Sequence, residues 1–572
     1  MREAFTVVVD KDVPMVTRDG TVLRSDVYRP LAEGRCPVLL GRTQYNKDSW
    51  GAWIEPERTA GEGYVVVVND MRGQYASEGE FDPFVFDVED SYDVVEWCAA
   101  QPWSNGKVGM FGSSSCGFVQ LQAAVSQPPH LVAMAPKQTW SSYGRGCVYD
   151  PGGGWSLYTL QWSLRATAAD PERRIGRDRP DYDAVRQGVA EVIRDIGRWY
   201  QRLPLLDELP SYPRDIAAFY YRPLEHPDHD GYWLTRNVAA HYEKIQVPAL
   251  HLVGWFDRFC VSTVNNYCGI RDRGGTETAR RNQRLVIGPW PHGIPVAEGC
   301  GEHYWGPSGT VSVRALVLRW YEYWLKGIDD GLLDEPPVRL FILGENVWRD
   351  EQEWPLARTR YVPYYVRSRG SANTLDGDGT LSPQPPDDEP ADTYRYDPTD
   401  PTPSVPGVME RPSGPVDQRP IERRQDVLVY STPPLEADVE VTGPVRVRLW
   451  AASSGRDTDW IVKLVDVHPD GYTLPLSLGM IRARYRESQA RPTLLEAGRA
   501  YEYAIEMRPV GNLFRAGHRI RVEIASAAFP EFDRNLNTGG AFGAESVGVV
   551  ATQHVFHDAA RPTQVVLPII PR

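Results

Sequence analysis

The hydrophobic residues of the first 350 positions fall into short runs separated by helical patterns. The near-continuous apolar runs lie at residues 38–40, 64–70, 108–111, 247–254 and 284–288. Runs of this kind suit strands that are buried on both faces of a parallel sheet. Residues 88–100, between two of the runs, show helical spacing of apolar positions. Alternating strands and helices predict an α/β fold.

Two flanking segments extend this pattern. Residues 1–30 alternate weakly around a turn signal at Asp19-Gly20, which predicts an antiparallel strand pair that enters the sheet. After the last apolar run, residues 313–325 predict an aromatic-rich helix.

The stretch from about 145 to 240 differs from the segments on either side. It begins with Pro151-Gly152-Gly153-Gly154 and continues with helical patterns, of which residues 182–203 are the clearest. We interpret it as a helical insertion into the α/β domain.

After about residue 355 the helical pattern ends, and strand-like stretches follow between Pro, Gly and Asp residues. These stretches are 427–430, 445–450, 460–467, 501–507, 520–524 and 564–567. Residues 383–420 are rich in proline and are expected to form a surface loop. The tail is therefore predicted to be an all-β domain of the two-sheet jelly-roll type.

The length of 572 residues is too great for a single core, so several domains are expected. The patterns divide the chain into a first core part at 1–144, a helical lid at 145–240, a second core part at 241–354 and a β domain at 355–572.

Composition narrows the class of protein. With 42% hydrophobic and 24% charged residues, the chain is typical of globular proteins, and its net charge of -14 argues against nucleic acid or an anionic membrane as partner. The seven cysteines fit neither a disulfide framework nor a zinc site. No signal peptide or membrane span is recognisable at the N-terminus or elsewhere. We therefore expect a cytoplasmic protein.

Candidate chemistry begins at residues 107–118, where a strand pattern ends in Gly112-Ser113-Ser114-Ser115-Cys116-Gly117 and a helical pattern follows. A serine in a strand–turn–helix corner can expose its hydroxyl above the sheet. Ser114 is the candidate nucleophile. Cys116 is the alternative, but it lies two residues further toward the helix and should point away from the corner.

A serine nucleophile needs a base, and the base needs an orienting acid. In this fold the acid and then the histidine should each follow a strand. Asp257 ends the pattern at 250–254, and His292 follows the strand at 285–288, which leaves room for one helix and one strand between them. Of the 11 histidines, only His303 competes, and no strand directly precedes it.

Two donors are expected for the oxyanion of the tetrahedral intermediate. One is the backbone N–H that follows the nucleophile, at Ser115. The other should come from the loop after an early strand, residues 41–47, where Tyr45 offers a phenol.

These residues resemble the cocaine esterase group, which is related to the X-Pro dipeptidyl peptidases and the α-amino-acid ester hydrolases. The resemblance covers essentially the whole chain. Its markers are Asp70-Met71-Arg72-Gly73 with Ser77-Glu78-Gly79, Gly112 to Gly117, Gly254-Trp255-Phe256-Asp257, Gly288-Pro289-Trp290-Pro291-His292, and Phe532-Asp533-Arg534-Asn535 with Asn537-Thr538-Gly539.

The resemblance implies an α/β-hydrolase core with an inserted helical lid and a C-terminal jelly roll. It implies hydrolysis of small-molecule esters or amides through an acyl-enzyme, without metal or cofactor. It assigns Ser114, Asp257 and His292 to the triad, Tyr45 to the oxyanion site, and Phe259 and Trp162 to the acyl-pocket wall. Ser115 stands where the group usually has tyrosine, so the adjoining pocket should be larger or more polar.

Two other functions remain open at this point. The same acyl-enzyme would serve an acyltransferase or amidase, including X-Pro or α-amino-acyl types, on a specialised metabolite or peptide. A non-catalytic protein that binds a small molecule or carbohydrate is the second alternative. Whether the chain forms a homodimer is also open.

Overall fold

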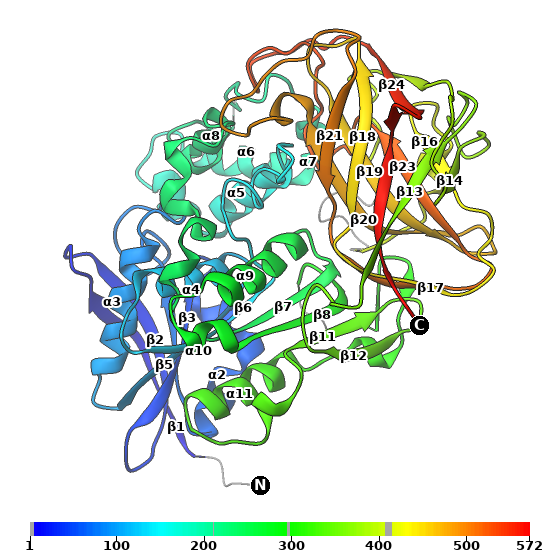
Figure 1. Ribbon diagram of the computed structural model, residues 1–572. Helices are drawn as coiled ribbons and strands as arrows, with labels where there is room; N and C mark the ends of the chain where they lie inside the picture. The colour runs from blue at the N-terminus through cyan, green and yellow to red at the C-terminus, as the bar shows by residue number, and fades with distance from the viewer. Residues whose placement is uncertain (1–4, 210, 294–297, 406–413) are drawn as a thin grey trace.

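The structure, a computed structural model, describes residues 5–209, 211–293, 298–405 and 414–572. Three regions pack together in it: a core sheet with helices on both faces, a group of helices above one edge, and a large all-β domain beside both (Figure 1). The predicted α/β core and the separate C-terminal β domain are confirmed. The jelly-roll strand order and the domain boundaries stay predictions.

The core sheet has ten strands, and its centre is parallel. The strands follow the order β1 (Val7–Val16), β2 (Val22–Pro30), β4 (Val65–Asp70), β3 (Cys36–Thr43), β5 (Ser104–Ser113), β6 (Leu131–Lys137), β7 (Ala249–Phe256), β8 (Gln283–Pro291), β11 (Val338–Ile342) and β12 (Val347–Glu351). β1 and β2 form the expected antiparallel pair, and β12 runs antiparallel to β11 at the other edge. The parallel strands therefore end at one common edge, where side chains from different strands can meet.

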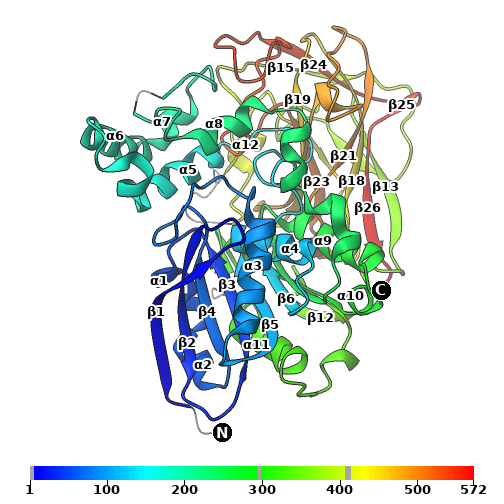
Figure 2. The ribbon, with the colours of Figure 1, turned by 90° about the vertical axis from the view of Figure 1, so that its left-hand side faces the viewer.

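Helices cover both faces of this sheet (Figure 2). On one face of the sheet lie α3 (Asp87–Ala100), α4 (Ser115–Ser126), α9 (Cys260–Arg273) and α10 (Glu277–Arg281). On the other face lie α2 (Pro56–Gly61) and α11 (Val313–Trp324). None of the described helices is long and apolar enough to span a bilayer.

The segment between β6 and β7 carries the predicted helices. They are α5 (Tyr158–Ala169), α6 (Tyr182–Arg194), α7 (Ile196–Tyr200) and α8 (Ala218–Glu225). The helical pattern predicted over 182–203 is confirmed as two helices, because Asp195 leaves helical geometry at φ -122° and ψ 44° and separates α6 from α7.

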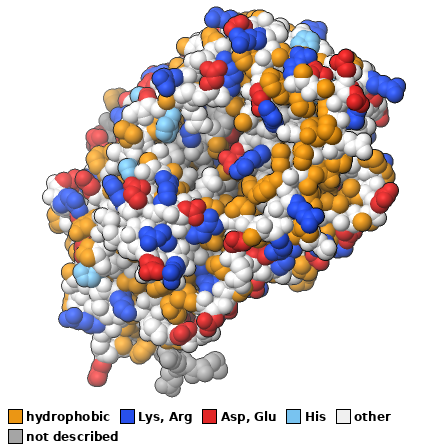
Figure 3. All heavy atoms as spheres, in the orientation of Figure 1, with side chains coloured by type: hydrophobic (Ala, Val, Ile, Leu, Met, Phe, Trp, Pro, Cys, Tyr) orange, Lys and Arg blue, Asp and Glu red, His pale blue; other side chains and the backbone are white. Residues whose placement is uncertain are grey.

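Among its described residues, the C-terminal domain is a network of fourteen strands. They are β13 (Arg360–Arg367), β14 (Thr380–Ser382), β15 (Asp392–Tyr396), β16 (Leu428–Ser431), β17 (Val439–Gly443), β18 (Arg446–Ser453), β19 (Asp459–Val467), β20 (Thr473–Arg482), β21 (Tyr501–Glu506), β22 (Val510–Phe514), β23 (Arg519–Ala525), β24 (Ala551–Asp558), β25 (Arg561–Pro562) and β26 (Gln564–Ile570). Apolar side chains gather over the β-domain half of the face shown in Figure 3.

The surface loop predicted over 383–420 is partly wrong. β15 lies within it and pairs with β24, with Asp392, Tyr394 and Tyr396 pointing into the domain. The hydrophobic pattern did not reveal this strand because it begins with a buried carboxylate, Asp392, and is flanked by prolines. Residues 406–413 of the predicted loop lie outside the described residues.

The β domain shares a hydrophobic core with the core sheet. Trp255 and Leu285 from the sheet pack in the same cluster as Val510 and Leu513 of β22. The backbone of Leu343 exchanges hydrogen bonds with Gly511 and Leu513. The two regions therefore meet through a continuous apolar interior.

The β domain also holds the start of the helical segment through a buried carboxylate. Asp533 accepts a hydrogen bond from the Trp155 N–H at 2.8 Å and one from the Arg482 guanidinium at 2.9 Å. Arg482 is also paired with Asp459. Gly152 packs so closely on the backbone of Met480 that a Cβ atom would lie 1.9 Å from its carbonyl oxygen. Asp533, one of the marker residues of the resemblance, thus anchors the start of the helical segment to the β domain.

We expect Asp533→Asn to destabilise the protein by about 3 kcal/mol, because it leaves part of the buried Arg482 charge uncompensated. Asp387→Asn is the control, since Asp387 is 92% exposed in its ion pair with Arg367 and should contribute about 0–1 kcal/mol. Denaturant unfolding measures both. Equal effects of the two substitutions would contradict this role of Asp533.

A buried histidine in β7 should make stability depend on pH. His251 Nε2 is hydrogen-bonded to Gln283 Oε1 at 2.9 Å, and burial lowers the pKa of His251 to about 4. The unfolded chain, with a histidine pKa near 6.5, binds more protons between these values, so stability falls as the pH drops through this window. We expect the His251→Gln protein to lose roughly 3 kcal/mol less stability than the unsubstituted protein when the pH is lowered through this window. Parallel pH–stability curves for the two proteins would disprove it.

Candidate active site

Ser114 occupies a sharp corner between β5 and α4. Its backbone has φ 61° and ψ -125°, a left-handed conformation that costs energy for a residue with a Cβ atom. Gly112 allows the close approach of β5 and α4, and Gly117 allows α4 to approach the end of β6 and the residues that follow it. A Cβ at Gly112 would lie 2.5 Å from the Cys116 carbonyl oxygen, and one at Gly117 would lie 2.9 Å from the Thr139 Cβ. The corner has the geometry of a nucleophile elbow.

The end of β6 holds this corner in place. The Ser114 N–H donates to the Lys137 carbonyl at 2.9 Å, and the Thr139 hydroxyl donates to the Ser114 carbonyl at 2.7 Å. The strained backbone is thus fixed on both sides by the neighbouring strand.

Asp257 and His292 form a hydrogen-bonded pair at the same edge of the sheet. Asp257 directly follows β7, is fully buried, and lies 2.9 Å through Oδ2 from His292 Nδ1. Its other oxygen accepts from the Phe259 N–H at 2.7 Å. With this arrangement Nδ1 of His292 carries a proton toward the carboxylate, and Nε2 is left to act as a base.

The turn that carries His292 depends on two residues that sequence reasoning missed. Gln138 donates to the Pro291 carbonyl at 2.9 Å and accepts from the Gly293 N–H at 3.1 Å, so one side chain brackets the histidine. The Lys137 ammonium donates to the Gly293 carbonyl at 2.9 Å. Burial lowers the pKa of Lys137 to about 8, partly opposed by Asp257. Their position at the C-terminal end of β6 was the available signal.

Ser114, Tyr45 and His292 line one cavity of about 260 Å³. Most of the other lining residues are aromatic: Trp50, Phe84, Trp140, Tyr143, Tyr158, Trp162 and Phe259. No described carboxylate belongs to the lining, and Arg258 is its one permanently charged side chain. Arg258 lies over the rings of Tyr158 and Phe259. The cavity therefore suits an apolar or aromatic group.

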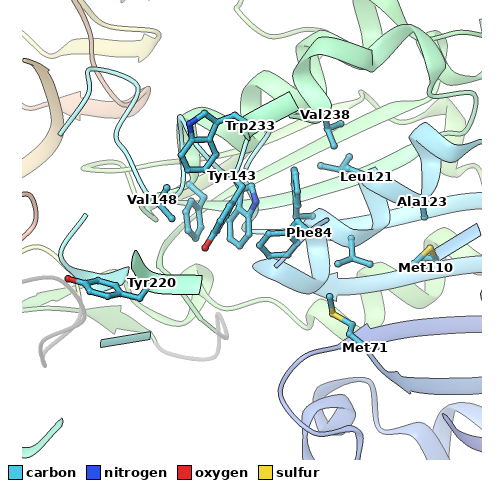
Figure 4. Close-up of a cluster of buried hydrophobic side chains, with 14 of the residues drawn as sticks. Met71, Phe84, Met110, Leu121, Ala123, Tyr143, Val148, Tyr220, Trp233 and Val238 are labelled. Carbon is cyan, nitrogen blue, oxygen red and sulfur yellow. The ribbon is translucent and has the colours of Figure 1, made fainter. Parts of the chain in front are cut away.

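Part of the cavity wall belongs to the main core cluster. Phe84 and Tyr143 have ring centroids 4.9 Å apart, and Tyr143 lies 6.1 Å from Trp233 (Figure 4). Because this wall is built on packed core residues, its shape is held by the fold.

Tyr45 lies beside this corner, and its role as an oxyanion donor stays a prediction. Its hydroxyl oxygen accepts hydrogen bonds from Trp162 Nε1 at 3.0 Å and from Ser115 Oγ at 3.2 Å. Burial raises the pKa of Tyr45 above its ordinary value. Ser115 is the first residue of α4, so its N–H has no acceptor within the helix. Trp162 and Phe259 line the cavity, whereas Ser115 is buried behind it.

A second cavity of about 200 Å³ shares Cys147, Arg258 and His292 with the first. Its other walls come partly from the β domain and include charged side chains, among them Arg508, Glu531 and Asp150. His292 thus stands between an aromatic cavity and a more polar one.

The alternative residues lie in unsuitable places. Cys116 is buried, and burial raises the pKa of its thiol to about 12, so it is a poor source of thiolate. His303 stacks on Trp305 with ring centroids 4.1 Å apart and lines neither cavity. His226 lies 2.7 Å from Asp230 in an exposed pair.

One group of side chains in the described ranges could hold a metal ion: Asp466, His468 and His518 in the β domain. Both oxygens of Asp466 already have partners, His518 at 2.8 Å and Asn512 at 3.1 Å. None of the three residues lines the cavity that contains Ser114.

Comparisons with known proteins agree with this geometry. Residues 19–294 match the X-Pro dipeptidyl-peptidase (S15) family, and residues 331–566 match the X-Pro dipeptidyl-peptidase C-terminal non-catalytic domain. The chain is 40% identical to the cocaine esterase of Rhodococcus sp. over 99% of both chains. It belongs to the cocaine esterase-like S15 hydrolases. It is therefore a serine hydrolase that acts on esters or amides.

Two solved structures resemble this chain over almost its whole length. An aminopeptidase from a marine sediment Thaumarchaeota archaeon has a TM-score of 0.82 at 25% identity, covering 99% of this chain and 97% of its own. An α-amino acid ester hydrolase has a TM-score of 0.80 at 26% identity with the same coverage. This architecture therefore occurs in solved hydrolases with different named activities.

We expect Gln138→Leu to lower kcat about tenfold or more, because loss of its two hydrogen bonds lets the His292 turn move. Gln553→Leu is the matched control: Gln553 is also a buried, hydrogen-bonded glutamine, but it lies in β24 and lines neither cavity. It should reduce stability without a comparable effect on kcat. Steady-state kinetics on folded protein would refute the assignment if both variants lost kcat equally.

Proposed function

We propose that the enzyme hydrolyses esters of uncharged apolar or aromatic acids through an acyl-enzyme on Ser114. The observation that carries this proposal is the cavity in which Ser114 and His292 meet an aromatic wall that has no described carboxylate. Hydrolysis by a triad explains why a strained serine, a buried acid–base pair and a phenol lie at one edge of the sheet.

In this mechanism His292 accepts the Ser114 proton as Oγ attacks the carbonyl carbon. Asp257 holds the imidazole and stabilises its positive charge. The Tyr45 hydroxyl and the Ser115 N–H donate to the oxyanion. His292 then protonates the leaving alcohol, and the same residues assist the attack of water on the acyl-enzyme, which regenerates the serine.

The cavity favours uncharged acyl groups over amino-acyl groups. An ammonium ion that enters this cavity loses part of its hydration, and the lining holds no described carboxylate to compensate for that loss. Arg258 instead places a positive charge at the lining. The Rhodococcus relative is a cocaine esterase, and an aromatic ester of that kind fits the wall better than the substrates named for the aminopeptidase and the amino acid ester hydrolase.

The second cavity is the proposed place for the leaving group and for the incoming nucleophile. It meets the acyl cavity at His292, where proton transfer to the alcohol and from water must occur. An acyltransferase would use the same acyl-enzyme with another nucleophile there, and product analysis with added alcohol or amine distinguishes the two activities. The hydrogen-bonded Asp257–His292 pair weighs against a non-catalytic binding role.

We further propose that the enzyme acts in the cytoplasm without a nucleic acid or membrane partner. The net charge of -14 and seven free cysteines support this proposal. If the enzyme forms a homodimer, the apolar side chains on the β-domain half of the face in Figure 3 offer a surface for contact between the two copies. Sedimentation analysis would measure the oligomeric state.

We expect Ser114→Ala to lower kcat by roughly four to six orders of magnitude, as for other triad serines. A fluorophosphonate should label Ser114, and Asp257→Asn should slow this labelling strongly, because the imidazole loses its orienting acid. Peptide mapping identifies the site. Undiminished turnover by folded Ser114→Ala protein would refute the proposed nucleophile.

Substrate preference can be measured with two esters that differ only in an amino group. Esters of phenylacetic acid and of phenylglycine with the same alcohol should differ in kcat/KM by roughly 100-fold or more, in favour of the phenylacetate, because the ammonium must be desolvated. The assay is run at a pH where the amine is protonated. A preference for phenylglycine would contradict the proposed acyl specificity.

A further inference from the structure

The Tyr45 hydroxyl oxygen receives hydrogen bonds from two different elements. Trp162 Nε1, on α5 of the helical segment, lies 3.0 Å away, and Ser115 Oγ, at the start of α4, lies 3.2 Å away. An indole N–H can only donate, so the direction of the first bond is certain. Tyr45 therefore accepts hydrogen bonds from both the core and the helical segment.

Accepting both bonds decides where the Tyr45 proton can go. A phenol oxygen has one proton to donate, and the two donors occupy its accepting side. No described protein group accepts this proton, and Tyr45 lines the cavity beside Ser114. Burial raises the pKa of Tyr45, so the phenol keeps its proton. The hydroxyl is thus held as a donor toward the cavity.

We propose that the Trp162 indole and the Ser115 hydroxyl are positioning residues that orient the Tyr45 proton toward the substrate oxyanion. The proposal rests on the proposed function of Tyr45 and adds to it. Neither side chain needs to touch the reacting atoms. Each acts by fixing the phenol before the reaction, so little reorganisation is needed as charge develops on the carbonyl oxygen.

The position of Trp162 in the chain gives this arrangement a second consequence. α5 belongs to the helical segment, whereas Tyr45 and Ser115 belong to the core. The oxyanion donor is therefore fully oriented only when the helical segment is docked on the core. Trp162 also packs edge-on against Phe219 of α8, with ring centroids 5.6 Å apart, so a second contact within the helical segment holds the indole.

The test is a double-mutant cycle on turnover. Tyr45→Phe should lower kcat about 100- to 1000-fold if the phenol binds the oxyanion. Trp162→Phe and Ser115→Ala should each lower kcat about 3- to 10-fold, with KM changed by less than about twofold, because each removes one hydrogen bond that matters in the transition state. In the Tyr45→Phe background both substitutions should have almost no further effect. Ser115→Thr, which keeps the hydroxyl, should retain more activity than Ser115→Ala.

Trp140→Phe is the matched control. Trp140 lines the same cavity, but its Nε1 has no hydrogen-bond partner in the described structure. Whatever this substitution costs should be the same with Tyr45 or Phe at position 45. Melting curves confirm that each variant is folded.

The outcomes separate the two proposals. If Tyr45→Phe is strongly impaired but the effects of Trp162→Phe and Ser115→Ala add to it in full, the positioning role is refuted and the oxyanion role stands. If Tyr45→Phe has normal kcat, both roles of this region fail, whereas Ser114→Ala still tests the nucleophile separately. Coupling at Tyr45 for both residues, without coupling for Trp140, would establish the inference.

Discussion

The left-handed backbone at Ser114 is the constraint on which the rest of the site depends. Such a conformation persists only when its surroundings hold it from several sides. Here the end of β6 does so, because Lys137 and Thr139 bond to the backbone of Ser114. Gln138, between them, brackets the turn of His292. Three consecutive residues thus hold the proposed nucleophile and the proposed base, which come from distant parts of the sequence.

Around this point the three regions contribute different chemistry. The core supplies the reacting groups, and the core and helical segment together supply the aromatic wall. The β domain supplies charged side chains to the second cavity, among them Arg508 and Glu531. In the proposed mechanism, this division places an aromatic, low-dielectric environment around the acyl group and a more polar one around the leaving group.

Much of this arrangement could be predicted because it follows from strand order. Asp257 and His292 follow buried apolar strands, and parallel strands end at one edge, so the residues could be identified before their distance was known. Gln138 was missed because nothing in its local pattern reveals that its amide meets a turn 153 and 155 positions away. β15 was missed because a buried Asp392, satisfied by Ser368 and Tyr430, looks in sequence like a loop residue. Tertiary hydrogen bonds, which sequence periodicity does not encode, explain both failures.

The continuous apolar interior between the core sheet and the β domain affects how the molecule unfolds. Separation of the β domain from the core sheet would expose Trp255 and Leu285 to water on one side and their partners in β22 on the other. The free-energy cost of that exposure links the two regions, so neither can open without weakening the other. In a calorimeter such coupling merges what could have been two heat-absorption peaks into one. A catalytic region cut away from its C-terminal neighbour would then be prone to aggregate, although none of the described residues of that neighbour lines the cavity that contains Ser114.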